Sequence, residues 1–251
     1  MTRFSWLPNR ALRYTALTSG ALGLFLLMAP YALADYVPPS EPSSPQESTS
    51  STGRRGGCDG EAETELTALA PQSYVGQTIS THPTFAWFIP DTQPFQVEFR
   101  LFEYNSGDRQ LIQKIDLQSS PGIMSWSLPP DQPGLSTGQR YFWQVVVHCD
   151  LNRPSSALVA EAEIEVVEIP SDLEMELDAA TDDLARVRLY GEAGLWYDAF
   201  NEVLAAGQDA AARDTRLGLL DNLVNSEVVM ETSIQEHQVR LTEIIELERS
   251  L

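Results

Sequence analysis

Apolar and polar residues alternate with a period of two through the middle of the chain, from about residue 64 to residue 169. The alternation is strict over residues 95–101 and 160–166, as in a strand with one buried face. Turn-forming Pro, Gly, Asn and Asp residues separate these segments from their neighbours. The seven predicted strands cover residues 65–70, 84–89, 95–101, 111–117, 122–128, 141–149 and 160–166. This spacing predicts a β-sandwich over residues 58–170.

The stretch from Leu135 to Val145 resembles the entry to the sixth strand of fibronectin type III and immunoglobulin-like domains. There a leucine and a tyrosine flank a turn, and the tyrosine hydroxyl bonds back across the corner. Tyr141 is the matching residue in this chain. The stretch therefore favours an immunoglobulin-like or fibronectin III-like sandwich.

After Pro170 the period of the pattern lengthens to about 3.6 residues, as in a helix. Ser171 and Glu174 have the spacing of a capping box, and so do Ser233 and Glu236 further on. An apolar stripe follows the first of these pairs and consists of Leu173, Leu177, Ala180, Leu184, Val187 and Gly191. Further helices are predicted over residues 195–206, 210–224 and 233–249. Residues 171–251 are thus predicted to be a helical region, as a second domain or packed on the sandwich.

One segment of the helical region looks like a single tetratricopeptide repeat, with Tyr190, Trp196 and Tyr197 as its aromatic residues. The match is partial, because Asp183 and Arg186 stand where the repeat carries tryptophan and leucine. We favour a helical hairpin docked on the sandwich, with these aromatic residues in the core. In the alternative, Tyr190, Trp196 and Tyr197 border a peptide-binding groove.

The first 34 residues have the layout of an export signal. Arg3, Arg10 and Arg13 precede an apolar stretch, and Ala34 ends the small-x-small pattern that signal peptidase accepts. The apolar stretch is shorter than the span of about 20 residues that a bilayer requires. We therefore expect cleavage between Ala34 and Asp35 and a periplasmic or extracellular protein without a stable membrane anchor.

Between this signal and the sandwich, residues 35–57 are rich in Pro, Ser, Thr, Gly and charge. Such a segment has little apolar surface to offset the entropy of ordering. It is predicted to be a flexible tether.

The chain has 16 basic and 36 acidic residues. Removal of the signal removes three arginines, which leaves a formal net charge of 13 − 36 = −23. This charge repels nucleic acid backbones and anionic lipid surfaces. It favours solubility, or alternatively a surface for divalent cations or for a basic partner.

Two cysteines are present, Cys58 and Cys149. In an oxidising compartment an isolated pair is first interpreted as a disulfide. Closing a loop of about 90 residues stabilises the folded state by roughly 4 kcal/mol in the chain-entropy treatment.

Catalytic interpretations find little support in the sequence. His82, His148 and His237 lie in three distant segments. His148, Cys149 and Asp150 are adjacent, but neighbours on a strand point to opposite faces and form no relay. We therefore predict a protein that is not an enzyme and has no cofactor or metal, with a carboxylate-based hydrolase as the least favoured alternative.

A calcium- or glycan-binding module is the second candidate function. Glu161, Glu163 and Glu165 share one strand face and offer oxygen ligands of the kind that calcium prefers. Ligands spaced along one strand do not converge, so we favour the solvent-facing side of an edge strand, where charge discourages aggregation. Trp126, near a turn, is the exposed aromatic residue that a glycan site would use.

Several motifs in order resemble the secreted cyanobacterial family called domain of unknown function 928. They lie at residues 55–58, 66–71, 83–90, 97–101, 122–123, 141–143, 149 and 194–199. The family has no established activity, so the resemblance implies location and architecture only. From the export signal, the sandwich followed by helices and the lack of a catalytic motif, we expect a non-catalytic binding or scaffold module of the cell envelope. Its partner is expected to be a protein or peptide.

Overall fold

The structure, a computed structural model, describes residues 1, 35–46, 56–105, 108–207 and 209–250. Residues 2–34 of the predicted export signal, including Ala34 before the cleavage point, lie outside the described residues. Within these ranges no helix has the length and apolar character needed to cross a membrane.

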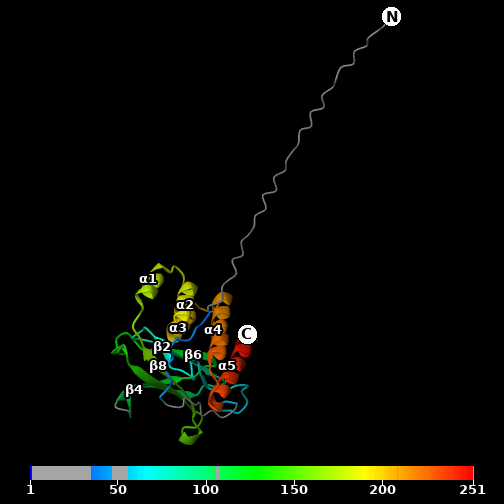
Figure 1. The fold of residues 1–251 in the computed structure, drawn as a ribbon. Helices are drawn as coiled ribbons and strands as arrows, with labels where there is room; N and C mark the ends of the chain where they lie inside the picture. Colours follow the sequence, from blue (N-terminus) through cyan, green and yellow to red (C-terminus); the bar gives the residue numbers. More distant parts are fainter. Residues whose placement is uncertain (2–34, 47–55, 106–107, 208, 251) are drawn as a thin grey trace. The chain divides into compact units, whose positions relative to one another are not determined.

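The strands of the described residues form two sheets (Figure 1). One has the order β1-β3-β6 and the other the order β2-β8-β7-β4-β5. Paired strands are antiparallel except β2 and β8, which are parallel. The strands are β1 (Thr67–Ala68), β2 (Gly76–Thr78), β3 (Thr84–Ile89), β4 (Gln96–Asn105), β5 (Asp108–Gln118), β6 (Gly122–Ser127), β7 (Arg140–His148) and β8 (Leu158–Val166). With the helices described below, the fold is α+β.

The two sheets contact each other through aromatic side chains. The ring of Phe85 on β3 lies 5.0 Å from that of Phe99 on β4 and 5.6 Å from that of Trp143 on β7. Val97, Phe99 and Leu101 are fully buried at every second position of β4, which confirms the period of two there, and Glu98 between the first two is also buried. The core between the sheets is therefore built from the alternating positions that the pattern predicted.

Two predicted contacts fix the ends of the sheets. Cys58 and Cys149 form a disulfide. At the entry to β7, the backbone N–H of Ser136 donates to the hydroxyl of Tyr141 over 2.9 Å. The tyrosine hydroxyl thus bonds back across the corner, as its position in the sequence predicted.

Five α-helices follow the strands in the described residues: α1 (Ser171–Ala179), α2 (Asp183–Glu192), α3 (Trp196–Ala205), α4 (Ala210–Ser226) and α5 (Thr232–Ser250). The predicted capping boxes are wrong. Pro170 precedes α1 without a side-chain cap, and α5 begins one residue before Ser233. The observed caps are Asp182 and Asp209, whose carboxylates accept from the backbone N–H three residues on.

Helix α3 joins the helices to the sheets. Trp143 donates its indole N–H to the hydroxyl of Tyr197 over 2.8 Å, and that hydroxyl donates to the backbone oxygen of Glu163 over 3.0 Å. Residues of the helices and of both sheets belong to one hydrophobic core. The boundary at residue 170 therefore separates two kinds of secondary structure that share a core.

The neighbouring residue, Asp198, attaches α3 to the end of β2. Its carboxylate accepts from the hydroxyl of Thr78 over 3.1 Å and from the backbone N–H of Ile79 over 3.0 Å. Burial raises the pKa of Asp198 to about 7, although these hydrogen bonds lower it. The short strand β2, which the sequence pattern did not predict, is thus held from both sides, by β8 and by α3.

Candidate interaction site

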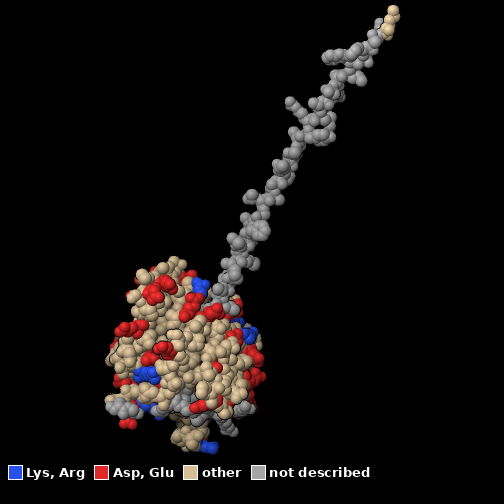
Figure 2. All heavy atoms as spheres, in the orientation of Figure 1, with Lys and Arg blue, Asp and Glu red and all other residues tan. Residues whose placement is uncertain are grey.

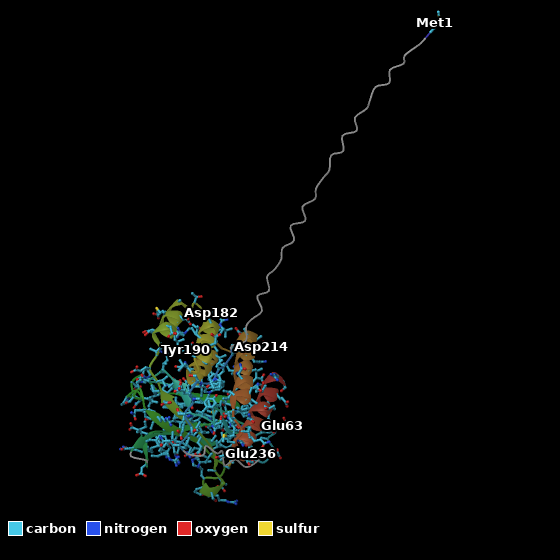
Figure 3. The ribbon with its side chains drawn as sticks, in the orientation of Figure 1. Met1, Glu63, Asp182, Tyr190, Asp214 and Glu236 are labelled. Atoms are coloured by element: carbon cyan, nitrogen blue, oxygen red, sulfur yellow. A yellow bond between two sulfur atoms is a disulfide. The ribbon has the colours of Figure 1, made fainter. Side chains whose placement is uncertain are left out.

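The three residues predicted to border a groove are buried. Tyr190 is 7% exposed, Trp196 is fully buried and Tyr197 is 2% exposed. Figure 3 labels Tyr190 on α2. None of the three therefore lines an open groove, and the favoured alternative, in which these aromatic residues belong to the core, agrees with their burial. Tyr197 contacts residues of the larger sheet, whereas Trp196 is covered by residues 35–46.

This covering segment consists of residues 35–46, which we call the strap. Tyr36 anchors it: the side chain is 4% exposed, and its ring meets that of Trp196 edge-on at 5.0 Å. Tyr74 donates its hydroxyl to that of Tyr36 over 3.2 Å. Burial raises the pKa of Tyr36 well above its ordinary value. The prediction of a flexible tether is thus wrong for residues 35–46, because a single buried aromatic residue outweighs the polar composition around it.

Two glycines let the strap backbone approach the turn between α2 and α3. The backbone N–H of Val37 donates to the oxygen of Gly191 over 3.0 Å. A Cβ atom on Gly191 would lie 2.8 Å from the backbone oxygen of Asp35. Gly194 has a φ of +77°, and a Cβ atom there would lie 3.0 Å from the nitrogen of Pro39. Both positions therefore favour glycine, for close approach and, at Gly194, for conformation.

The second half of the strap crosses to the larger sheet. The backbone oxygen of Ser43 accepts from the N–H of Val75 over 2.9 Å, and the Ser43 hydroxyl donates to Glu165 over 3.1 Å. The backbone N–H of Gln46 donates to the carboxylate of Glu163 over 2.8 Å. These glutamates belong to β8, which lies between β2 and β7. The interpretation of residues 160–166 as an edge strand with a solvent-facing row of glutamates is therefore wrong.

A buried carboxylate holds the loop that carries Tyr74 and Val75. Glu227, at the end of α4, accepts from the backbone N–H of Gln72 over 2.6 Å and from that of Ser73 over 2.7 Å. Burial raises the pKa of Glu227. The Tyr74 hydroxyl also lies 3.0 Å from that of Ser226. Contacts within residues 56–250, which we call the body, thus position the tyrosine that meets the strap.

We call the surface under the strap the strap site and define it as Tyr74, Val75, Gly191, Gly194 and Trp196. The strap site contacts the ring of Tyr36 and forms backbone hydrogen bonds with the strap at Gly191 and at Val75. The strap backbone also passes close to the two glycines. Contacts of these kinds hold residues 35–46 on the body and are also used by proteins that bind peptides. Sequence reasoning did not find Tyr36, Tyr74 and Glu227. The available signal was an aromatic residue at position 36 in a segment otherwise poor in apolar residues.

Other predicted chemistry is placed elsewhere or used structurally. Trp126 is half-buried and lies 4.8 Å from Phe99, ring to ring, so it is not the exposed aromatic residue expected for a glycan site. Cys149 is in the disulfide. Among the described side chains, no group of three His, Cys, Asp or Glu is placed to hold a metal ion. Figure 2 shows acidic side chains spread over the visible face of the molecule and few basic ones.

A model of the family described as Domain of Unknown Function (DUF928) matches residues 50–236. The chain belongs to this family. A comparison with curated proteins found no match. The DUF928 match contains every residue of the strap site, whereas the strap itself, residues 35–46, precedes it.

Proposed function

We propose that this DUF928 protein is an exported, non-catalytic binding module of the cell envelope that engages a protein or peptide partner. The observation that carries the proposal is the strap site, where the body already holds a stretch of polypeptide that belongs to no helix or strand. Its contacts are a buried tyrosine and backbone hydrogen bonds, which are the contacts that peptide-recognising proteins use.

We further propose that the sheets form an immunoglobulin-like or fibronectin III-like sandwich and that α2 and α3 form a tetratricopeptide-like hairpin. The strand orders and the hydrogen bond at Tyr141 support the first part. The close approach of another chain segment at Gly191 and Gly194 supports the second. Both kinds of architecture present surfaces on a rigid frame, as a binding module requires.

Export to the periplasm or beyond is supported by the signal-like pattern of residues 1–34 and by the disulfide. The disulfide between Cys58 and Cys149 is typical of proteins in oxidising compartments. The net charge of −23 in residues 35–251 favours a partner with a basic surface.

The test is affinity capture with residues 35–251 immobilised in folded form. The matched control is the same protein unfolded by heat before immobilisation, which has the same charge without the fold. We expect at least one envelope protein on the folded protein alone. This protein, once purified, should bind in solution, and more weakly when the salt concentration rises from about 0.15 M to about 0.5 M. Equal recovery on folded and unfolded protein would contradict the proposal.

A further inference from the structure

We propose that the strap site is a separable binding site for an extended tyrosine–proline peptide, and that the strap is its resident ligand. The inference deepens the proposed function and rests on it, because it names the class of peptide that the module recognises. It makes the strap a competitor that a partner must displace.

The strap has the composition of a peptide ligand. It reads DYVPPSEPSSPQ, with the anchor Tyr36 followed by prolines at positions 38, 39, 42 and 45. Proline fixes φ, so a proline-rich segment loses less conformational entropy when it binds in extended form. This explains how a segment with one buried aromatic side chain stays ordered on the body.

The strap site has specificity for tyrosine. The ring of Tyr36 packs edge-on against Trp196, and its hydroxyl accepts from Tyr74. A phenylalanine would keep the ring contact and leave the Tyr74 hydroxyl without that acceptor. An alanine would lose both contacts. The pair of substitutions therefore separates burial of the ring from recognition of the hydroxyl.

The strap site is also built without help from the strap. Trp196 is fixed by donating its indole N–H to the backbone oxygen of Leu69 over 2.9 Å. The loop before Tyr74 is fixed by Glu227. Both contacts lie within the body. Removing the strap would therefore expose a preformed surface, which is the condition for a peptide to bind there with little reorganisation.

The attachment of the strap to the body keeps the site filled. A tethered ligand has an effective concentration in the millimolar range, so a free peptide of the same sequence competes poorly with it. Cutting the chain between strap and body removes this advantage. The intact protein is thus predicted to be closed to added peptide, and the cut protein open to it.

The experiment uses the folded protein of residues 35–251 with a specific protease sequence inserted between residues 46 and 56. After cutting, the strap should co-elute with the body in gel filtration at high concentration. A fluorescently labelled peptide of residues 35–46 should exchange into the cut protein and leave the uncut protein unlabelled. The same peptide with Tyr36→Ala should bind about 10- to 100-fold more weakly, and with Tyr36→Phe at an intermediate level.

Three results would overturn the inference. The cut body, still folded by near-ultraviolet circular dichroism, takes up no labelled peptide. The Tyr36→Ala peptide binds as well as the native peptide. The body unfolds on cutting, which would make the strap an integral part of the fold. If the cut protein exchanges the labelled peptide but the capture experiment recovers no envelope protein, this inference is supported and only the proposed function is contradicted.

Discussion

Substitution of Gly191 by alanine tests the strap site with a single methyl group. The new Cβ atom would lie 2.8 Å from the backbone oxygen of Asp35, closer than such atoms approach in folded proteins. The contact is with backbone rather than a flexible side chain, so the start of the strap must move. The hydrogen bond from Val37 to the Gly191 oxygen, over 3.0 Å, would lengthen or break.

The same substitution is favourable for the helix itself. Gly191 lies in α2, where alanine is preferred over glycine by about 0.5–1 kcal/mol. On the strap side, loss of one hydrogen bond costs about 0.5–1.5 kcal/mol. The two effects nearly cancel in the free energy of global unfolding, which we expect to change by less than about 1 kcal/mol. They do not cancel in the free energy of local opening of the strap, because the strap loses a hydrogen bond and gains nothing from the better helix propensity.

Amide hydrogen exchange distinguishes the two effects. In Gly191→Ala we expect the protection of the Val37 amide to fall by up to about tenfold. The lost hydrogen bond is worth up to about 1.5 kcal/mol, and about 1.4 kcal/mol corresponds to a factor of ten. Urea unfolding should stay nearly unchanged. Glu192→Ala is the matched control, since it changes an exposed neighbour on the same helix and adds no atom toward the strap. Unchanged protection at Val37 in Gly191→Ala would refute the close approach on which the strap site depends.

Three further predictions concern the frame. The exported protein should have the mass of residues 35–251 and no alkylatable thiol, and replacing Cys58 and Cys149 by serine should lower the free energy of unfolding by roughly 4 kcal/mol in urea titrations. Tyr197→Phe should cost about 1–3 kcal/mol, because the buried indole N–H of Trp143 loses its acceptor; a cost near zero would exclude this contact. Asp198 has a folded pKa of about 7 against 3.8 unfolded, so the folded state keeps a proton that the unfolded chain releases. The free energy of unfolding, measured by urea titration, should therefore fall by at most about 4 kcal/mol as pH rises from 4 to 7. This fall should be absent in Asp198→Asn.

Periodicity reports local burial, which each segment carries in its own residues, and it predicted most of the strands and helices. It missed β2, and the single apolar stripe from Leu173 to Gly191 is divided between α1 and α2 in the structure. The alternation over residues 95–101 and 160–166 corresponds to parts of β4 and β8. The lengthened period after Pro170 corresponds to α1 onward. The corner at Tyr141 was also predictable, because its hydrogen bond spans only five residues.

The errors concern pairing and contacts between distant segments. The sequence of residues 160–166 predicts an edge strand, because the parallel pairing with β2, more than 80 residues earlier, leaves no mark in β8 itself. Composition described residues 35–57 as a tether because it averages over the segment. The order of residues 35–46 depends on contacts with distant residues, such as that of Tyr36 with Trp196, 160 residues later. The candidate site and the order of the strands were therefore not predicted for the same reason, because both depend on contacts between segments distant in the sequence.

Three consecutive residues at the start of α3 make contacts in three directions. Trp196 meets the strap and the backbone of Leu69, Tyr197 enters the sheets, and Asp198 holds the end of β2. Successive helical residues point about 100° apart, so one turn can serve all three partners. Consequently, substitution of Trp196 or Tyr197 would change stability and binding together and could not separate them. The strap site must instead be probed from the ligand side, at Tyr36, or at Gly191, where the added atom meets the strap and the helix is not weakened.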